Sequence, residues 1–372
     1  MSRARDLADL AGSADAGGIT GKNLIINGAM QVAQRGTVTG ATHDSYGGPD
    51  RYKISESGDT VFTMSKDSDT PTGKGFANSL KLDVTTADSS LAASDYASVI
   101  YNIEGQDLQR IKKGTSSAES VTLSFYIKST ITGTYVVQLY DNDNNRSVSK
   151  SYTVSSADTW EKKTLTFPAD TTGAFDNDNA LSLLIRWWFA AGTDYTSGTL
   201  ATSWESYNGA NAAVGQVNAV NSASNNIFIT GVQLELGDTA TPFEHRSYGD
   251  ELARCQRYYQ KDLYIGNNVI AIGTTVGTSE AYAPMSFSGG QMRTSPTITL
   301  PTAGQGSNLM TFLKDNSGYP TTTGSHSVTA VSNISFRLAG SSYVGLSGNG
   351  VATWLYPGPA SGSVYFEYDA EL

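Results

Sequence analysis

The sequence predicts an all-β protein: a jelly-roll sandwich followed by a short helix and a second, smaller β-sandwich. Three observations lead to this fold class. The 372 residues include 38 glycines and 20 tyrosines, and 16% of them are charged, which is typical of turn-rich β proteins. Many segments alternate apolar and polar residues with a period of two, as strands with one wet face do. By contrast, residues 247–261 have a helical pattern.

The chain is expected to have four parts. Residues 1–21 form an N-terminal docking peptide and linker, because Leu7 and Leu10 lie at helical spacing before a run of small residues. A frayed terminus is the alternative. The other parts are the first sandwich, the linker helix and the second sandwich, at residues 22–246, 247–261 and 262–372.

Strand patterns recur through the first sandwich. "SVTLSFYIKS" and "TYVVQLYDND" alternate apolar and polar residues, whereas "LSLLIRWWFA" is continuously apolar. The latter therefore suits a central strand buried on both faces, with Trp187 and Trp188 in the core. About eight to ten such segments, separated by turn residues, are typical of a two-sheet sandwich of the jelly-roll kind.

The helical stretch "LARCQRYYQK" follows directly. Ser247 and Asp250 have the spacing of a capping pair. Leu252, Cys255 and Tyr259 then fall along one face. Because an isolated helix of this length is marginal in water, that face must pack on a flanking sandwich or on a copy of itself.

Residues 262–372 return to the strand pattern, with at least six short segments such as "EAYAPMSFSG" and "SVYFEYDAEL". This number suits a second, smaller sandwich. Pro296 and Pro301 bracket "TITL", which predicts an edge strand.

Composition argues against several function classes. The net charge of −10 disfavours a nucleic-acid partner. No apolar run is long enough to cross a membrane, and the N-terminus does not resemble a signal peptide, so we expect synthesis and folding in a cytoplasm. His43, His245 and His326 are far apart and there is no G-x-S-x-G motif, so no enzyme is predicted. Paired carboxylates of a glycoside hydrolase remain an alternative.

No cofactor is predicted, and "DNDNNR" is only a weak candidate for calcium. Asp141, Asp143 and Asn145 stand at alternate positions, as in a calcium loop, but Arg146 replaces the required glycine. A plain hairpin turn is favoured there.

Glycan binding would use exposed aromatic rings beside amide and carboxylate groups. Trp204 and Tyr207, together with Asn208, have this pattern in "TSWESYNGAN". The alternative is that Trp204 is a lid packed on the sandwich.

Two segments support a resemblance to a family. "NLIINGAMQVAQRG" and "GVQLELGDTATPFEHRSYGDELARCQRYYQK" resemble the flanks of a carbohydrate-binding-module-like jelly roll of phage tail fibre and other virion appendage proteins. If the first and last strands of the sandwich pair, as such folds commonly allow, the two flanks Asn23–Met30 and Phe228–Leu236 are neighbours in space. The closing "YFEYDAEL" is similar to the small sandwich that often follows in those proteins.

This resemblance implies a homotrimeric virion component, on tail or capsid surface, that contacts a bacterial host glycan for attachment. Leu252, Cys255 and Tyr259 would form the trimer seam, while Leu7 and Leu10 would dock the N-terminus on other virion proteins. A capsid-attached head fibre or decoration protein, a polysaccharide depolymerase and a free lectin are the alternatives.

Overall fold

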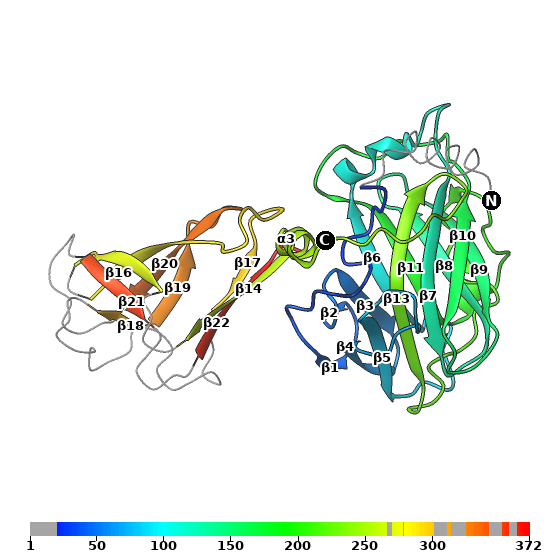
Figure 1. Cartoon of the computed structure of the whole chain (residues 1–372), viewed down its shortest axis with the longest axis horizontal. Helices are drawn as coiled ribbons and strands as arrows, with labels where there is room; N and C mark the ends of the chain where they lie inside the picture. The colour runs from blue at the N-terminus through cyan, green and yellow to red at the C-terminus, as the bar shows by residue number, and fades with distance from the viewer. Residues whose placement is uncertain are drawn as a thin grey trace. The chain divides into compact units, whose positions relative to one another are not determined.

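The computed structural model of the chain describes residues 21–265, 270–277, 279–300, 311–313, 325–341, 352–356 and 363–372. These residues form an all-β fold of antiparallel sheets, as predicted (Figure 1). The chain divides into two compact units, one of Met1–Leu252 with Leu372 and one of Ala253–Glu371. Leu7 and Leu10, which were expected to dock the N-terminus, lie outside the described residues.

Two sheets build the first unit. The six-stranded sheet has the order β1-β4-β5-β13-β7-β10. In that order its strands are Val38–Ala41, Val61–Asp67, Ser79–Thr86, Asn226–Leu236, Val121–Ser129 and Glu161–Phe167. The seven-stranded sheet has the order β12-β9-β8-β11-β6-β3-β2. Its strands are Glu205–Ser206, Arg146–Val154, Gly133–Asp141, Leu181–Ala191, Tyr96–Glu104, Tyr52–Ser57 and Ser45–Tyr46.

Short turns of helix lie in the connections of this unit. They are η1 (Gly105–Asp107), η2 (Gln109–Ile111), α2 (Thr193–Thr196) and η3 (Gly209–Asn211). The last two belong to the connection of residues 192–216, which follows β11 and returns to the seven-stranded sheet through β12.

Apolar side chains from the facing sides of the two sheets form one core, which includes Phe125 of β7 and Ile185 and Trp187 of β11. β11 is the middle strand of its sheet, and both of its tryptophans are fully buried, as predicted. They face opposite sides of the sheet. Trp187 enters the main core, whereas Trp188 packs with Val136 in a smaller cluster on the outer face. The continuous apolar run of β11 therefore reflects burial on both faces.

The two flanks of the first sandwich lie side by side, as expected. The Leu24 amide donates to the Leu234 carbonyl at 2.9 Å, and the Val232 amide donates to the Gly28 carbonyl at 2.9 Å. The side chain of Asn23 bridges the same segments, because its Nδ2 donates to the Val232 carbonyl at 3.1 Å and its Oδ1 accepts from the Leu234 amide at 3.1 Å. Gly28 is required here, since a Cβ would lie 2.1 Å from the Val232 carbonyl oxygen.

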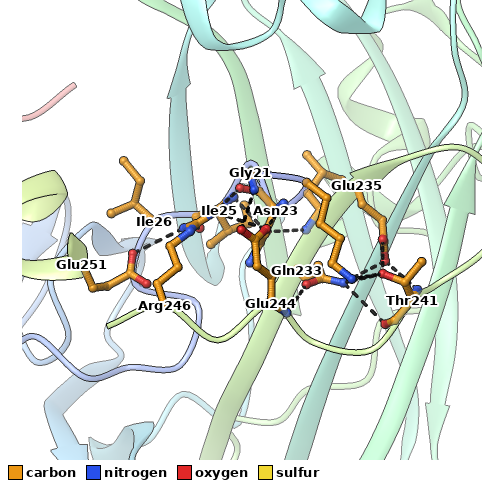
Figure 2. Close-up of polar contacts among 12 residues, drawn as sticks. Gly21, Asn23, Ile25, Ile26, Gln233, Glu235, Thr241, Glu244, Arg246 and Glu251 are labelled. Carbon is orange, nitrogen blue, oxygen red and sulfur yellow. Dashed lines mark hydrogen bonds and ion pairs between the residues drawn. The ribbon is translucent and has the colours of Figure 1, made fainter. Parts of the chain in front are cut away.

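Three charged side chains that follow β13 add further contacts to the segment of residues 21–28 (Figure 2). We call this set of contacts the N-terminal clasp. Glu244 accepts from the amides of Gly21 at 2.6 Å and Asn23 at 2.8 Å. Arg246 donates to the Ile25 carbonyl at 2.9 Å. Glu251 accepts from the Asn27 amide at 2.7 Å and lies 3.5 Å from Arg246. The clasp is therefore a polar network that joins the start of the first unit to its end.

The helix α3 (Tyr248–Gln256) begins with the predicted cap. The Asp250 amide donates to Ser247 Oγ at 3.2 Å, and that hydroxyl donates to the Asp250 carboxylate at 2.8 Å. The helix is shorter than the predicted span of 247–261. Tyr259 opens the strand β14, so it does not continue the helical face of Leu252 and Cys255. Tyr258 and Tyr259 are both buried, Tyr258 in the turn after the helix and Tyr259 at the start of the strand.

The second unit contains two further sheets. The three-stranded sheet has the order β14-β22-β17, with strands Tyr259–Ile265, Ser363–Asp369 and Thr297–Thr299. The six-stranded sheet has the order β18-β21-β15-β16-β20-β19. Its strands are Thr311–Leu313, Ala352–Tyr356, Ala271–Thr275, Ala281–Ser286, Ser335–Ser341 and Ser325–Thr329. β17, predicted as an edge strand from its flanking prolines, is the last strand of its sheet.

Candidate functional site

Trp204, a predicted glycan contact, packs against the main core and is partly buried. Its indole N–H donates to the Pro168 carbonyl at 2.9 Å, and the ammonium of Lys113 lies 5.2 Å from the centre of its ring. The ring of Trp204 is therefore in contact with Lys113, and its indole N–H has a hydrogen-bond acceptor within the fold. This is the arrangement of a lid packed on the sandwich, which was the alternative considered for Trp204.

Lys113 itself is held in a cage of oxygen atoms. Its Nζ donates to Asp141 Oδ2 at 2.5 Å and to the carbonyls of Thr172 at 2.9 Å and Gly173 at 2.8 Å, and it lies 3.0 Å from Asp170 Oδ2. The side chain of Lys113 is 2% exposed. Arg146 donates to both oxygens of Asp170, at 2.8 and 3.2 Å. Two cations and two carboxylates thus form a buried and balanced network, the Lys113 cage.

The suspected calcium loop belongs to this network. Residues 141–146 form the hairpin turn between β8 and β9, as favoured from the sequence. Asp141 is directed to Lys113 and to the Asn144 amide at 3.1 Å, while Asp143 accepts from the Asp176 amide at 2.9 Å. Among the described residues, no group of three or more His, Cys, Asp or Glu side chains could hold a metal ion.

Tyr207 and Asn208 contact other residues than Trp204 does. Asn208 is exposed and accepts from the Ala210 amide at 3.2 Å, which caps η3. Tyr207 packs edge-on against Tyr140 of β8, with ring centres 5.3 Å apart. Tyr207 is therefore brought to the outer face of the seven-stranded sheet, whereas Trp204 packs against the main core.

That outer face carries the more informative cluster. Arg186 alternates with the core residues Ile185 and Trp187 along β11, so its side chain points away from the core. In the sheet register Arg186 lies opposite Gln138 of β8 on one side and Ile100 of β6 on the other. Its guanidinium carbon lies 4.8 Å from the ring centre of Trp188 and 5.3 Å from that of Tyr96.

Four partly exposed tyrosines surround this arginine. Tyr96 and Tyr195 contact each other with ring centres 5.4 Å apart, and Tyr195 also lies 5.3 Å from Trp188. Tyr140 and Tyr207 form the edge-on pair described above. We call this surface the Arg186 face and define it by Tyr96, Gln138, Tyr140, Arg186, Trp188, Tyr195 and Tyr207.

The connection that supplies two of these tyrosines is fixed to the sheet. Gln216 accepts from the Val136 amide at 2.8 Å, and the Ser149 hydroxyl donates to the Ala212 carbonyl at 2.8 Å. The Ala213 amide donates to the Tyr195 carbonyl at 2.9 Å. Ala212 and Ala213 are fully buried against Trp188 and Val136. The aromatic rings of the Arg186 face are therefore held in place before any ligand binds.

Several donors on this face have no partner. The side chain of Arg186 forms no hydrogen bond or ion pair with any residue that the structure describes, and its Nε is buried. The Nε2 of Gln138 is buried and unpartnered as well, on a residue that is 2% exposed, and so is the indole N–H of Trp188. Buried donors normally find acceptors, so such a group is a sign of a missing partner.

The electrostatic surroundings of Arg186 also indicate that its charge has no close partner among the described residues. Burial lowers the pKa of the guanidinium from its ordinary value, and Tyr96, Tyr207, Tyr195 and Asp44 partly oppose this shift. Burial also raises the pKa of the Tyr207 hydroxyl, although the charge of Arg186 opposes it. Asp44, the carboxylate that acts on Arg186, is 69% exposed and lies 3.7 Å from Lys53. The cation on this face is therefore weakly compensated.

The predicted oligomer seam is divided between elements. Cys255 is fully buried in α3 and Leu252 is partly exposed, while Tyr259 lies buried in β14. No helix within the described ranges is both long and apolar enough to cross a membrane.

Comparison with protein families finds no match, and neither does comparison with curated proteins. Several solved structures are similar in part. The enzymatically active domain of tailspike protein 4 of bacteriophage CBA120 has a TM-score of 0.33 at 18% identity, over 58% of this chain and 21% of that one. The chain thus spans about a fifth of that structure.

Two sugar-related structures are similar over a comparable share of the chain. A family 11 carbohydrate-binding module of a Clostridium thermocellum cellulase has a TM-score of 0.28 at 14% identity, over 57% of this chain and 98% of that one. A putative sugar binding protein from Bacteroides thetaiotaomicron has a TM-score of 0.31 at 13% identity, over 57% and 99%. TM-scores below 0.5 support no conclusion, so we infer function from the side chains.

Proposed function

We propose that the first unit is a glycan-binding module and that its ligand lies on the Arg186 face. The observation that carries this proposal is a set of partly exposed, pre-arranged tyrosines around buried donors without partners. A sugar offers both complementary features. Its C–H face packs on aromatic rings, and its hydroxyl and ring oxygens accept hydrogen bonds.

A binding role is favoured over an enzyme. Three of the carboxylates of this unit are engaged in the fold, Asp141 and Asp170 with Lys113 and Glu244 in the N-terminal clasp. The Arg186 face has donors and rings but no carboxylate of its own. Hydrolysis of a glycosidic bond ordinarily needs two carboxyl groups beside the scissile bond.

We further propose that the chain is a structural component of a phage virion appendage, on tail or capsid, which uses this face to contact a host surface glycan. The resemblance of its two flanking segments to virion appendage proteins supports this role. A homotrimer and N-terminal docking on other virion proteins belong to the same proposal. Light scattering of the purified chain would test the trimer, and loss of particle incorporation on deleting residues 1–21 would test docking.

Affinity electrophoresis tests the glycan-binding function directly. The full chain is run through gels that contain one polysaccharide each, including mixed-linkage β-glucan, xylan, galactan, alginate and polygalacturonate. We expect retardation in at least one gel. Tyr207→Ala and Tyr140→Ala should each weaken it about three- to tenfold, since one aromatic contact contributes about 0.5–1.5 kcal/mol.

Tyr126→Ala is the matched control, because Tyr126 is a partly exposed tyrosine of the six-stranded sheet that packs on Phe76. Binding that is lost in Tyr126→Ala and kept in Tyr207→Ala would place the ligand on the other sheet. Unretarded migration in every gel would reject a glycan-binding role.

A further inference from the structure

We propose that the sugar bound at the Arg186 face carries an acidic substituent, and that Arg186 and Gln138 hold its carboxylate. This inference rests on the proposed glycan-binding function and specifies the class of glycan. It follows from the kind of groups left without partners on this face. It also follows from how their positions are fixed.

The unpartnered groups are donors. Arg186 Nε and Gln138 Nε2 are N–H groups, and both are buried with no acceptor among the described residues. A neutral sugar hydroxyl both donates and accepts, so it suits a face of mixed groups. A carboxylate only accepts, through two oxygens with about four lone-pair sites. A face that presents unpaired donors is therefore best matched by a carboxylate.

The two donors lie next to each other on the sheet. Arg186 and Gln138 are direct register partners on β11 and β8, and side chains opposite each other on one face are about 5 Å apart at Cβ. The guanidinium is a planar fork that binds two carboxylate oxygens at once, and the amide can add a third hydrogen bond.

The guanidinium is also held by its neighbours. Trp188 lies 4.8 Å and Tyr96 5.3 Å from its carbon. These rings pack on the guanidinium and restrict the long side chain, and neither ring forms a hydrogen bond with it. The N–H groups of the fork are thus oriented before binding, which lowers the entropy cost of capturing an anion.

No carboxylate among the described residues forms an ion pair with Arg186, and Asp44, which acts on its charge without pairing, is 69% exposed. Burying a cation away from water is costly unless it is paired, and proteins normally pair such groups. In this unit Lys113 follows that rule with two carboxylates, whereas Arg186 does not. An acidic ligand would supply the missing charge, so binding should favour it over its neutral counterpart.

Long-range attraction does not supply this preference. The chain has a net charge of −10, so an acidic polysaccharide is repelled at a distance. Selectivity must then arise from the local hydrogen bonds of the fork. Accordingly, poly-L-glutamate, which has carboxylates but no sugar ring, should not compete.

The test compares acidic polysaccharides with neutral partners of the same backbone. The full chain is titrated with polygalacturonate, alginate and polysialic acid, and with polygalacturonate in its fully methyl-esterified form. We expect binding to at least one acidic polymer, and at least tenfold weaker binding to its esterified or carboxyl-reduced form. Arg186→Met should weaken binding to the acidic form about tenfold to a hundredfold, because hydrogen bonds to charged groups are strong.

Further variants separate recognition from general charge. Gln138→Leu should weaken binding several-fold, and Arg186→Lys should recover part of the affinity lost in Arg186→Met. Arg337→Met is the matched control, because Arg337 also stacks on a tyrosine, Tyr282 at 4.6 Å, but lies in the second unit. An unchanged melting temperature would show that each variant is folded.

The outcomes distinguish the two proposals. Binding to a neutral glucan or xylan that is unchanged in Arg186→Met would reject the acidic ligand and leave the glycan-binding function in place. Equal competition by poly-L-glutamate, or binding to none of the three acidic polymers, would also reject the acidic ligand. Failure to bind any polysaccharide, neutral or acidic, would reject both.

Discussion

Lys113 and Arg186 are both cations packed on aromatic rings in the first unit, but Lys113 is buried whereas Arg186 is only partly buried, and their partners differ. Lys113 lies over Phe175 and Trp204 and is surrounded by four oxygen atoms. Arg186 lies over Tyr96 and Trp188 and has no oxygen partner among the described residues. The first arrangement is complete within the protein, and the second is not. We therefore assign Lys113 to the stability of the fold and Arg186 to binding.

The largest expected effect comes from Lys113→Met. Removing the ammonium leaves Asp141 buried without its counterion and leaves Asp170 with Arg146 alone, and breaking a buried pair in this way costs about 3–5 kcal/mol. For a unit of this size the melting temperature should fall by about 10 °C. Differential scanning calorimetry measures it.

Lys112→Met is the control, because Lys112 is the neighbouring residue, is 53% exposed and pairs with Glu119 at the surface. Its change in the free energy of unfolding should stay below about 1 kcal/mol. If Lys113→Met were as mild as Lys112→Met, the Lys113 cage would not be a stabilising network.

An intermediate loss of folding stability is expected when the pH is lowered. Burial raises the pKa of Asp170, but hydrogen bonds from Arg146 and Lys113 outweigh it, and the pKa is lowered overall. A lowered carboxyl pKa stabilises the folded state above the ordinary pKa, and this contribution is lost as the pH falls through the folded-state value. Urea midpoints measured from pH 7 to pH 2.5 should therefore drop on the acid side.

Asp170→Asn should reduce the fall of the urea midpoint at low pH. Arg186→Met should leave this fall unchanged, since Arg186 has no carboxylate partner among the described residues. Glu244, whose pKa is also lowered overall by hydrogen bonds from Asn23 and Gly21 despite its burial, contributes in the same direction. If the urea midpoint of Asp170→Asn fell as steeply at low pH as that of the natural chain, the pH dependence would come from other carboxyl groups.

The smallest effect is expected from Arg186→Met in the absence of ligand. It removes two ring contacts but also removes a partly buried cation that has no ion-pair partner among the described residues. The free energy of unfolding should change by at most about 1 kcal/mol, and the change should be neutral or stabilising, as for residues kept for binding. A loss of more than about 2 kcal/mol would mean that Arg186 is a structural residue like Lys113.

Much of the fold could be predicted because its patterns are local. The continuous run around Trp187 and Trp188 indicated a strand buried on both faces, and Ser247 with Asp250 marked the start of a helix. The end of that helix could not be predicted. Tyr259 fits a helical face by spacing, but its backbone pairs with Asp369 of β22, more than a hundred residues later in the chain.

The candidate site was harder to predict because it depends on alternation across strands that are distant in sequence. Trp204 and Tyr207 looked equivalent, yet one packs beside Lys113 and the other on Tyr140. Arg186 was visible as the one charged residue within "LSLLIRWWFA". A lone arginine in an apolar strand was the available signal, but its lack of an acidic partner appears only when β8 and β6 are placed beside it.

The Lys113 cage has a consequence for the conditions that this corner of the fold can tolerate. Two carboxylates and two carbonyls directed at one point are the ligands that a hard metal ion prefers. Here a covalently attached ammonium fills that point. Chelators and dilution, which strip exchangeable ions from proteins, cannot remove a cation that is part of the polypeptide. The stability of the Lys113 cage is therefore expected not to depend on the calcium concentration of the solution.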